Sequence, residues 1–310
     1  MLATHGLDLL KDGQPTKLWG VRLANALEDD EHAGRVIDAL DDYADHGVNA
    51  VTWFLQGGSS GAANAVREDG SLDPAYANRM HRLLDAAVDR EMITVVGIFY
   101  QGRRLLPRTA RAVERAVESV AKWLLPYRDV IVNVANEYHA SAYDRVHQVY
   151  PFGDPAAINH LIDVVRHADP ERLVGANAKQ LELVLPVARH ANVALHDDPG
   201  LSEQLLLEHG VGKPVIDVEC GGFAFDMGRP GVFTAGEKLF HLAQIRSAAS
   251  LRGKSVFFHA HWFQEPPRRF DLGGYGDEQD RGVHWYFDML AELLNLDPCK
   301  QVLVRPPRTS

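Results

Sequence analysis

Cysteine is scarce in this chain: of its 310 residues only two are cysteine, Cys220 and Cys299. Two cysteines cannot build a disulfide framework, and their wide separation excludes the Cys-x-x-Cys pairs that hold structural zinc ions. A single bridge between them is still compatible with the sequence, so it leaves open whether both thiols are free.

Basic residues are also outnumbered, with 32 Lys and Arg against 42 Asp and Glu, which gives a formal net charge of -10. Nucleic-acid binding depends on clustered basic side chains, so we expect no nucleic-acid partner. The stretch from Met1 to Gly20 has neither a basic start nor a sustained apolar segment, so neither a signal peptide nor a membrane anchor is expected. The default location is therefore the cytoplasm, or outside the cell if a leader was removed.

Short apolar runs alternate with helix-like patterns along the whole chain, which is 46% hydrophobic and long enough to bury a large core. Segments such as Ala33, Val36, Ile37, Leu40 repeat apolar residues with a helical period. The runs between them predict strands. The eight predicted strands are 18–25, 49–56, 92–100, 130–137, 172–177, 192–196, 214–220 and 255–261.

Eight strands alternating with helices predict an α/β fold, a closed (β/α)8 TIM barrel formed by residues 1–310 as a single domain. An open doubly wound sheet usually has a glycine-rich phosphate turn after its first strand, and residues 26–29 are not such a turn. Residues 1–17, with Asp12-Gly13 as a turn, predict a short hairpin that caps the barrel floor.

The beginnings of several helices carry independent signals. Asp73-Pro74 and Asp154-Pro155 each place a capping carboxylate before a proline at the first helical position. Thr234 and Glu237 fit a capping box. A last helix is expected near residues 283–295.

Two β-branched apolar runs end on glutamate, at Glu137 and at Glu219. A buried parallel strand delivers its last side chains to the carboxyl edge of the sheet, where α/β barrels carry out chemistry. Two carboxylates at that edge are the minimum equipment for cleaving a glycosidic bond. Strict alternation places Asp217 on the same face as Glu219, and it turns Asn136 away from Glu137 unless the strand bulges or ends there.

The order of these residues resembles the clan A glycoside hydrolases, most closely their cellulase-like members related to glycoside hydrolase family 5. In that family Asn-Glu ends the fourth barrel strand and Glu ends the seventh, as Asn136-Glu137 and Glu219 do here. The resemblance implies a retaining hydrolase that cleaves a glycosidic bond, β-linked by expectation, in two displacements. Glu137 would be the acid/base, Glu219 the nucleophile and Asn136 a ligand of the sugar 2-hydroxyl. No metal or organic cofactor is required, and the expected partner is a carbohydrate.

Other positions match the family less completely. His196 resembles its strand-six histidine, but Asp198 stands where an aromatic residue is expected. Trp262, after strand eight, resembles the tryptophan that forms the floor of the sugar subsite in the family. Three further residues are candidate substrate ligands because they lie where the family carries supporting side chains: Arg22, Trp53 and Tyr100.

Two alternatives stay open from the residues. A metal-dependent barrel hydrolase could use His196, His259 and His261 together with Asp197, because a His-x-His pair on one strand points two imidazoles the same way. A non-catalytic barrel could instead use the glutamates to bind sugar. The sugar, its linkage and endo or exo cleavage depend on loops, where sequence patterns are least informative.

Overall fold

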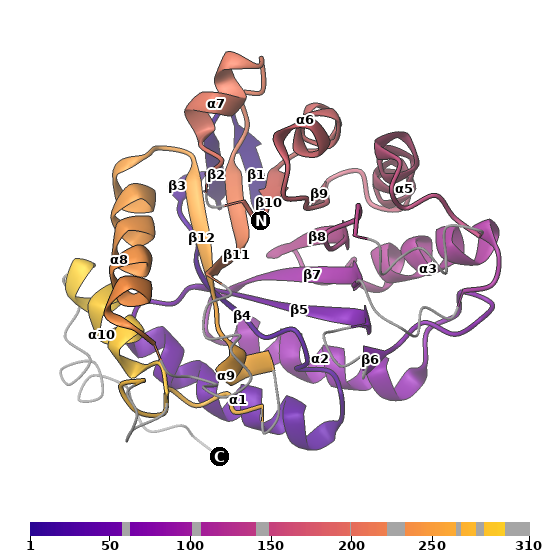
Figure 1. Ribbon diagram of the computed structural model, residues 1–310. Helices are drawn as coiled ribbons and strands as arrows, with labels where there is room; N and C mark the ends of the chain where they lie inside the picture. Colours follow the sequence, from indigo (N-terminus) through magenta and orange to yellow (C-terminus); the bar gives the residue numbers. More distant parts are fainter. Residues whose placement is uncertain are drawn as a thin grey trace.

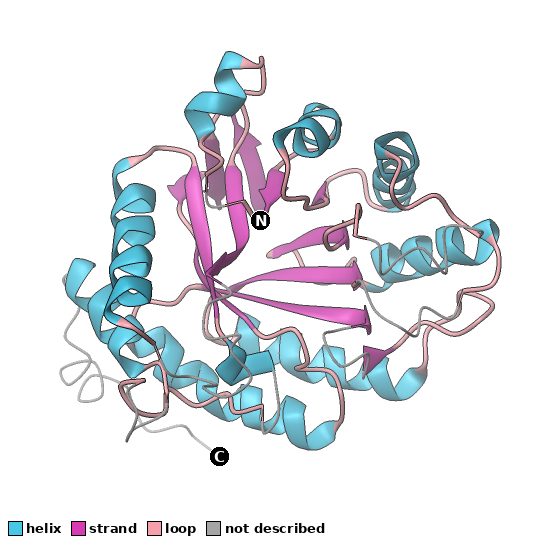
Figure 2. Ribbon diagram, viewed as in Figure 1, coloured by secondary structure: helices cyan, strands magenta, loops and turns pink. Residues whose placement is uncertain are grey.

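A computed structural model describes residues 1–57, 63–100, 107–140, 149–198, 200–221, 233–264, 268–276 and 282–294. Its centre is a ring of parallel strands enclosed by helices (Figures 1 and 2). The eight strands are β4 (Trp19–Arg22), β5 (Ala50–Gly57), β7 (Ile93–Phe99), β8 (Val130–Ala135), β9 (Leu173–Gly175), β10 (Ala194–His196), β11 (Val215–Gly221) and β12 (Lys254–His259). Each corresponds to one of the eight strands predicted from the sequence.

The strands pair in the order β10-β11-β12-β4-β5-β7-β8-β9, so every strand lies beside its neighbours in the chain. Between β9 and β10 the contact is narrow: one parallel bridge joins Ala178 to His196, and the Asn192 N–H donates to the Val174 carbonyl at 3.1 Å. A two-residue strand, β6 (Ala63–Asn64), pairs antiparallel with the end of β5. The predicted (β/α)8 barrel is thus confirmed.

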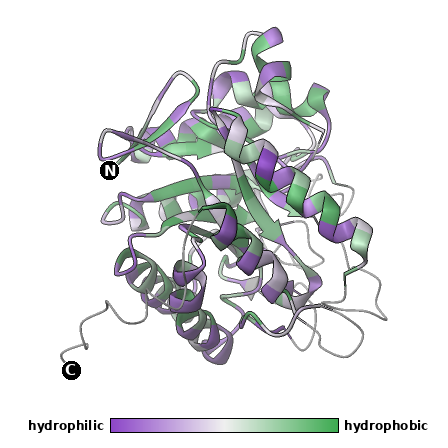
Figure 3. Cartoon of the chain, turned by 90° about the vertical axis from the view of Figure 1, so that its left-hand side faces the viewer, coloured by the Kyte–Doolittle hydropathy of each residue, from purple (hydrophilic) through white to green (hydrophobic). Residues whose placement is uncertain are grey.

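Helices cover the outside of the ring, and Figure 3 shows largely apolar strands inside helices that carry both polar and apolar residues. They are α1 (Asp30–Asp45), α2 (Pro74–Val88), α3 (Ala110–Trp123), α5 (Pro155–Ala168), α6 (Leu181–His190), α7 (Glu203–Glu208), α8 (Ala235–Ser250), α9 (His261–Gln264) and α10 (His284–Leu293). In the described ranges, none of the helices is long and apolar enough to cross a membrane.

The caps predicted from the sequence start three of these helices. Asp73 and Asp154 accept hydrogen bonds from Ala75 and Ala156, each before a proline in the first turn. Thr234 and Glu237 form a complete capping box at α8. Local sequence therefore fixes where α2, α5 and α8 begin.

The hydrophobic core has two layers, because strand side chains alternate between the barrel interior and the helices. The outer layer includes Val21, Val51 and Val132 with the apolar helix faces. The inner layer fills the barrel and consists of Leu2, Leu9, Leu18, Ala50, Ile93, Val95, Ile131, Leu173, Val193, Leu195, Ile216, Val218 and Phe257.

The N-terminal segment forms a three-stranded antiparallel sheet, β1 (Leu2–His5), β2 (Asp8–Lys11) and β3 (Gln14–Thr16). The predicted turn at Asp12-Gly13 joins β2 to β3, with both residues at positive φ, 52° and 77°. The sequence interpretation missed β1. Leu2 and Leu9 pack with the inner barrel layer, so this sheet lies at the end opposite to the carboxyl ends of the strands.

Candidate active site

Polar and charged side chains gather at the carboxyl ends of the barrel strands, which is where α/β barrels place their active sites. They come from almost every strand of the ring, either from its last residues or from the loop that follows. The group comprises Arg22 on β4, Tyr100 after β7, Asn136 and Glu137 after β8, Lys179 after β9, Asp197 after β10, Glu219 on β11 and His259 on β12.

Glu137 is presented by a break in strand geometry. β8 ends at Ala135, and Glu137 has φ of 41°, in the left-handed region that a non-glycine residue rarely adopts. The Asn136 N–H still donates to the Phe99 carbonyl at 2.8 Å, so the turn begins immediately afterwards. Because the strand ends here, Asn136 and Glu137 both reach the site although they are adjacent in sequence.

Glu219 is presented by a bulge. The register of β11 against β12 shifts between Asp217 and Cys220, and the Glu219 N–H donates to Asp217 Oδ1 at 3.1 Å. Val218 packs in the inner layer, whereas Cys220 packs in the outer one. The prediction that Asp217 shares a face with Glu219 is therefore wrong, because the extra residue at the bulge reverses the alternation.

Three carboxylates meet at the centre of the site. Glu137, Asp197 and Glu219 each contribute an oxygen to a group whose members all lie within 4.8 Å of one another. Their side chains are 8%, 0% and 14% exposed. Three buried carboxylates at this separation repel one another strongly when ionised, so the site needs positive charge or bound protons to persist.

Arg22 supplies part of that positive charge. Its side chain is fully buried, and Nη2 lies 3.1 Å from Glu219 Oε2 and donates to Asn136 Oδ1, also at 3.1 Å. Nη1 donates to the Val218 carbonyl at 3.2 Å. Arg22 thus links the residues that follow strand four with those on strand seven, and its predicted role as a substrate ligand stays a prediction.

Aromatic rings hold the Arg22 guanidinium in place. It lies 4.8 Å from the ring centroid of Phe54 and 5.3 Å from that of Tyr100, and the Tyr100 hydroxyl is hydrogen-bonded to it. An added Cβ at Gly97 would lie 2.0 Å from the Phe54 ring, so glycine is required there. Tyr100 is therefore a buried support of the arginine rather than an exposed sugar platform.

Lys179 supplies the second positive charge. Its Nζ lies 2.7 Å from Glu137 Oε1 and 3.9 Å from Asp197 Oδ2, while its side chain is 54% exposed. The sequence interpretation did not identify Lys179, and it named Asp197 only as a metal ligand. Their position in the sequence could have indicated them, because both residues lie in loops that follow barrel strands.

The pKa values indicate how the charges are distributed. Burial and the neighbouring Glu137 and Glu219 raise the pKa of Asp197 to about 9, with Lys179 opposing the rise. Burial also raises the pKa of Glu219, which Arg22 opposes and Glu137 reinforces. With Asp197 protonated at neutral pH, less negative charge remains for Arg22 and Lys179 to compensate.

His259 borders the nucleophile candidate without carrying charge. Its Nε2 lies 3.6 Å from Glu219 Oε1. Burial, followed by the charge of Arg22, holds its pKa well below the ordinary histidine range. A neutral imidazole adds no positive charge, so Arg22 remains the cation that faces Glu219.

The predicted substrate role of Trp53 is corrected by its position. Trp53 packs in the outer layer between sheet and helices, and its side chain is fully buried there. Its neighbour Phe54 points into the barrel and contacts Arg22. The prediction had the right strand and the wrong face, since adjacent strand residues point in opposite directions.

The predicted substrate role of His196 is corrected in the same way, because the neighbouring residue is the one that faces the site. Val193 and Leu195 face the barrel interior and Ala194 the outer layer, so His196 follows the outer face and Asp197 reaches the carboxylates. His196 Nδ1 accepts from the Asp198 N–H at 3.2 Å. Burial, with a further effect of Lys254, lowers the pKa of His196 to about 3, so it is neutral.

Trp262 lies in α9, directly after the eighth strand, and is 8% exposed. Its indole N–H donates to the Asp271 carbonyl at 2.9 Å, and the Arg269 guanidinium lies 5.5 Å from its ring centroid. These contacts fix the ring against the loop of residues 268–276. Its role as a sugar platform remains a prediction.

The metal hypothesis is not supported by the histidines on which it rested. Within the described part of the chain, the side-chain groups with metal-ligand spacing are Glu137, Asp197, Glu219 and, elsewhere, His46, His284, Asp288; neither includes His196, His259 or His261. In the carboxylate group, Lys179 and Arg22 already provide the compensating charge. Cys220 is a free, buried thiol, and Cys299 lies outside the described residues.

The comparisons with known proteins now bear on this architecture. A glycoside hydrolase family 5 mannosidase from Rhizomucor miehei is similar in structure, with a TM-score of 0.64 at 12% identity over 94% of this chain and 96% of that one. The fold is that of the clan A glycoside hydrolases. A GH5-4 broad-specificity endoglucanase from an uncultured bacterium is also similar in structure, with a TM-score of 0.60 at 12% identity over 89% of this chain and 93% of that one.

A third similar structure comes from Bacteroides vulgatus and is described only provisionally as a glycoside hydrolase. It has a TM-score of 0.66 at 15% identity; 96% of this chain is covered, and the chain spans 61% of that protein's length. The sequence itself matches no protein-family model and no curated protein. At these identities the likeness concerns the fold.

Proposed function

We propose that this protein hydrolyses a β-glycosidic bond with retention of anomeric configuration, with Glu219 as nucleophile and Glu137 as acid/base. One observation carries the proposal: oxygens of the two glutamates, from the fourth and seventh strands of a barrel, lie within 4.8 Å of each other. Retaining glycosidases have carboxyl groups about 5–5.5 Å apart, whereas inverting enzymes need about 6.5–9.5 Å to admit a water molecule.

In the first displacement, a Glu219 oxygen attacks the anomeric carbon while Glu137 donates a proton to the departing glycosidic oxygen. The glycosyl ester that forms removes the negative charge of Glu219. In the second displacement, Glu137 takes a proton from water, the hydroxyl bonds to the anomeric carbon, and Glu219 leaves as a carboxylate. Arg22 stabilises that carboxylate between turnovers and fixes its orientation.

Asp197 and Lys179 flank Glu137. Burial and the two neighbouring glutamates raise the pKa of Asp197 to about 9, so it holds a proton at neutral pH, and one of its oxygens lies within 4.8 Å of a Glu137 oxygen. The ammonium of Lys179 lies 2.7 Å from Glu137 Oε1. We therefore assign Asp197 and Lys179 as positioning residues that orient the Glu137 carboxyl for proton transfer.

The substrate class follows from the fold and from the similar structures. These are described as a mannosidase and an endoglucanase, so β-mannosides, β-glucosides and the corresponding β-1,4-glycans are the first compounds to test. Asn136, held by Arg22, is assigned to the sugar 2-hydroxyl, and Trp262 to a sugar face.

The direct test is hydrolysis of a panel of aryl β-glycosides, followed by proton NMR of the first product formed. We expect the β-anomer to appear before mutarotation. Initial formation of the α-anomer would contradict retention. If sugars bind equally well to wild type and Glu219→Gln but neither turns over, the protein is a non-catalytic sugar-binding barrel.

Replacing Asp197 by asparagine is expected to stabilise the protein at neutral pH while impairing activity. The pKa of Asp197 in the folded protein is about 9, well above the 3.8 of an ordinary aspartate. Below pH 4 both states bind the proton and stability is unaffected; as pH rises toward 9, only the unfolded state releases it, so folding is progressively disfavoured. Asparagine removes this penalty, which is on the order of 2–4 kcal/mol at pH 7.

Urea unfolding of wild type and Asp197→Asn at pH 4 and pH 8 measures this difference. The variant should gain stability at pH 8 and almost none at pH 4. Asp198→Asn changes a neighbouring carboxylate that accepts from the Gly200 N–H and should show no such pattern. The alkaline limb of the activity profile should also move to lower pH in Asp197→Asn. Unchanged stability and an unchanged alkaline limb would refute the assignment.

A further inference from the structure

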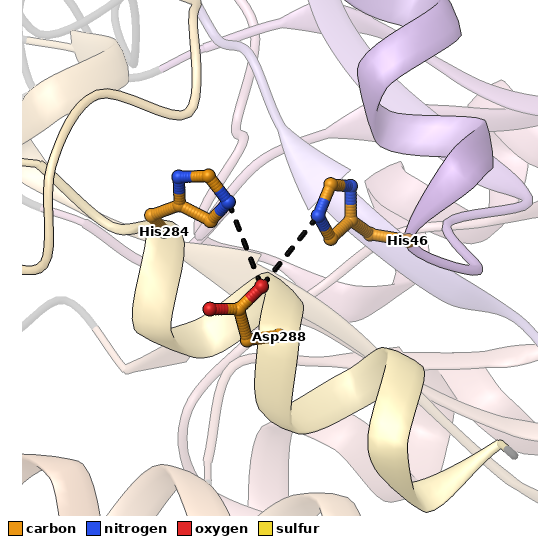
Figure 4. Close-up of side chains that lie close together, drawn as sticks. All are labelled: His46, His284 and Asp288. Carbon is orange, nitrogen blue, oxygen red and sulfur yellow. Dashed lines mark ion pairs between the residues drawn. The ribbon is translucent and has the colours of Figure 1, made fainter. Parts of the chain in front are cut away.

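Two histidines and an aspartate converge on the outside of the barrel, where the first helix meets the last. His46 caps the end of α1, His284 is the first residue of α10, and Asp288 lies one turn further along α10 (Figure 4). The two helices are packed together here, with the rings of Tyr43 and Phe287 stacked at 5.4 Å. This cluster belongs to the helical layer and shares no residue with the carboxylate site.

Backbone carbonyls fix the tautomer of both histidines. His46 Nδ1 lies 2.7 Å from the Asp42 carbonyl, and His284 Nδ1 lies 3.3 Å from the Gly273 carbonyl. A carbonyl can only accept a hydrogen bond, so each Nδ1 carries the proton and each neutral ring presents its Nε2 lone pair. Anchoring of this kind is what orients histidines that bind metal ions.

Both lone pairs point toward the same carboxylate oxygen. His284 Nε2 lies 3.5 Å from Asp288 Oδ1, and His46 Nε2 lies 3.7 Å from it (Figure 4). These separations exceed the 2.7–3.2 Å of a direct hydrogen bond. Three acceptors that converge in this way repel one another, and a cation bound among them would relieve that repulsion.

The spacing suits a metal ion better than a shared proton. A zinc ion bonded at about 2.0–2.2 Å to tetrahedral ligands holds neighbouring ligand atoms about 3.3–3.6 Å apart. Two imidazole nitrogens and one carboxylate oxygen are a donor set for Zn²⁺, Co²⁺ or Ni²⁺ rather than for Mg²⁺ or Ca²⁺. The His284 and Asp288 side chains are 32% and 45% exposed, so an ion can enter and keep water at its fourth position.

We propose that His46, His284 and Asp288 form a binding site for a divalent transition-metal ion of the Zn²⁺ type that joins α10 to α1. A bound ion would connect the two ends of the barrel's helical layer, since α1 follows the first strand of the ring and α10 follows the last. The site is independent of the proposed hydrolysis, because none of its residues touches the carboxylates.

The test is a titration of untagged, chelator-treated protein with ZnCl2, followed by isothermal calorimetry and by thermal unfolding. We expect one Zn²⁺ per chain with a Kd in the micromolar range, a rise in Tm of about 3–6 °C at a hundredfold excess over Kd, and no shift with MgCl2. The variants His284→Gln and Asp288→Asn should each lose this shift while keeping the Tm of the metal-free wild type within about 2 °C.

The matched control is His190→Gln, which breaks a similarly exposed histidine–aspartate pair with His190 Nε2 2.7 Å from Asp163 Oδ1. Among the described residues this pair belongs to no three-residue group with metal-ligand spacing. This variant should bind Zn²⁺ like wild type. If no binding is detected at Zn²⁺ concentrations up to 100-fold above the micromolar range, the proposal is overturned. The two histidines and Asp288 would then form ion pairs alone. Binding that persists at full stoichiometry in both His284→Gln and Asp288→Asn would overturn it as well, since the ion would then lie elsewhere.

Discussion

Replacing Glu219 by glutamine is expected to lower kcat on an aryl β-glycoside by about 10⁴-fold or more, because an amide cannot form the glycosyl ester on which both displacements depend. The fold should persist, since Arg22 keeps Asn136 Oδ1 and the Val218 carbonyl as acceptors. Steady-state kinetics and a circular-dichroism melt measure the two effects separately.

A matched control is Glu118→Gln, the same chemical change at a surface glutamate on α3 that pairs with Lys122. It should retain wild-type kcat. In Glu219→Ala, added azide should restore turnover and yield the α-glycosyl azide, because the small anion attacks from the side that the carboxylate vacated. Wild-type-like turnover in Glu219→Gln would rule out its role as nucleophile.

Replacing Glu137 by glutamine is expected to lower kcat by about 10²–10⁴-fold on substrates with poor leaving groups. The loss of kcat/KM should be much smaller for dinitrophenyl glycosides, whose leaving group needs no proton. Hydrolysis of the glycosyl ester should then become rate-limiting, because no base activates water, and a burst of phenol should precede the steady state.

The contrast between leaving groups distinguishes acid/base catalysis from a structural effect. A variant that simply distorted the site would lose kcat/KM equally for both substrates. With azide, Glu137→Ala should yield the β-glycosyl azide, the opposite anomer to that from Glu219→Ala. An equal loss across leaving groups would assign the proton transfer to another residue, and Asp197 would be the first to examine.

The strands and the two glutamates could be predicted because their signals are local. An apolar β-branched run must be buried wherever it lies, and its last residue must reach the carboxyl edge. The same holds for the caps at Asp73, Asp154 and Thr234, which depend only on residues within one helical turn. Eight such units leave a closed barrel as the simplest arrangement.

The face of the sheet on which a side chain lies was less predictable, because one bulge reverses the alternation of all the strand residues that follow it. Strict alternation assigned Asp217 to the side of Glu219, and the β11 bulge separates them. For Trp53 and His196 the prediction chose the wrong member of an adjacent pair, and Phe54 and Asp197 are the ones that face the site. Nothing in a single strand reveals such a register.

The charge balance of the site could not be predicted, since it depends on contacts between distant parts of the chain. Arg22 meets Glu219 across 197 positions of sequence, and Lys179 reaches Glu137 from the following βα loop. Each residue alone reads as an ordinary charged side chain. Their roles emerge only when the barrel brings strands one, four, five and seven to a common edge.

As the nucleophile, Glu219 becomes covalently attached to the sugar, and trapping that ester makes the bond visible. A 2-deoxy-2-fluoro β-glycoside with a dinitrophenyl leaving group, of the sugar best cleaved in the aryl panel, slows the second displacement and lets the ester accumulate. Peptide mass spectrometry after proteolysis should find one sugar on the peptide that contains Glu219. A label on Glu137 or Asp197, or rapid phenol release without any adduct, would contradict the account.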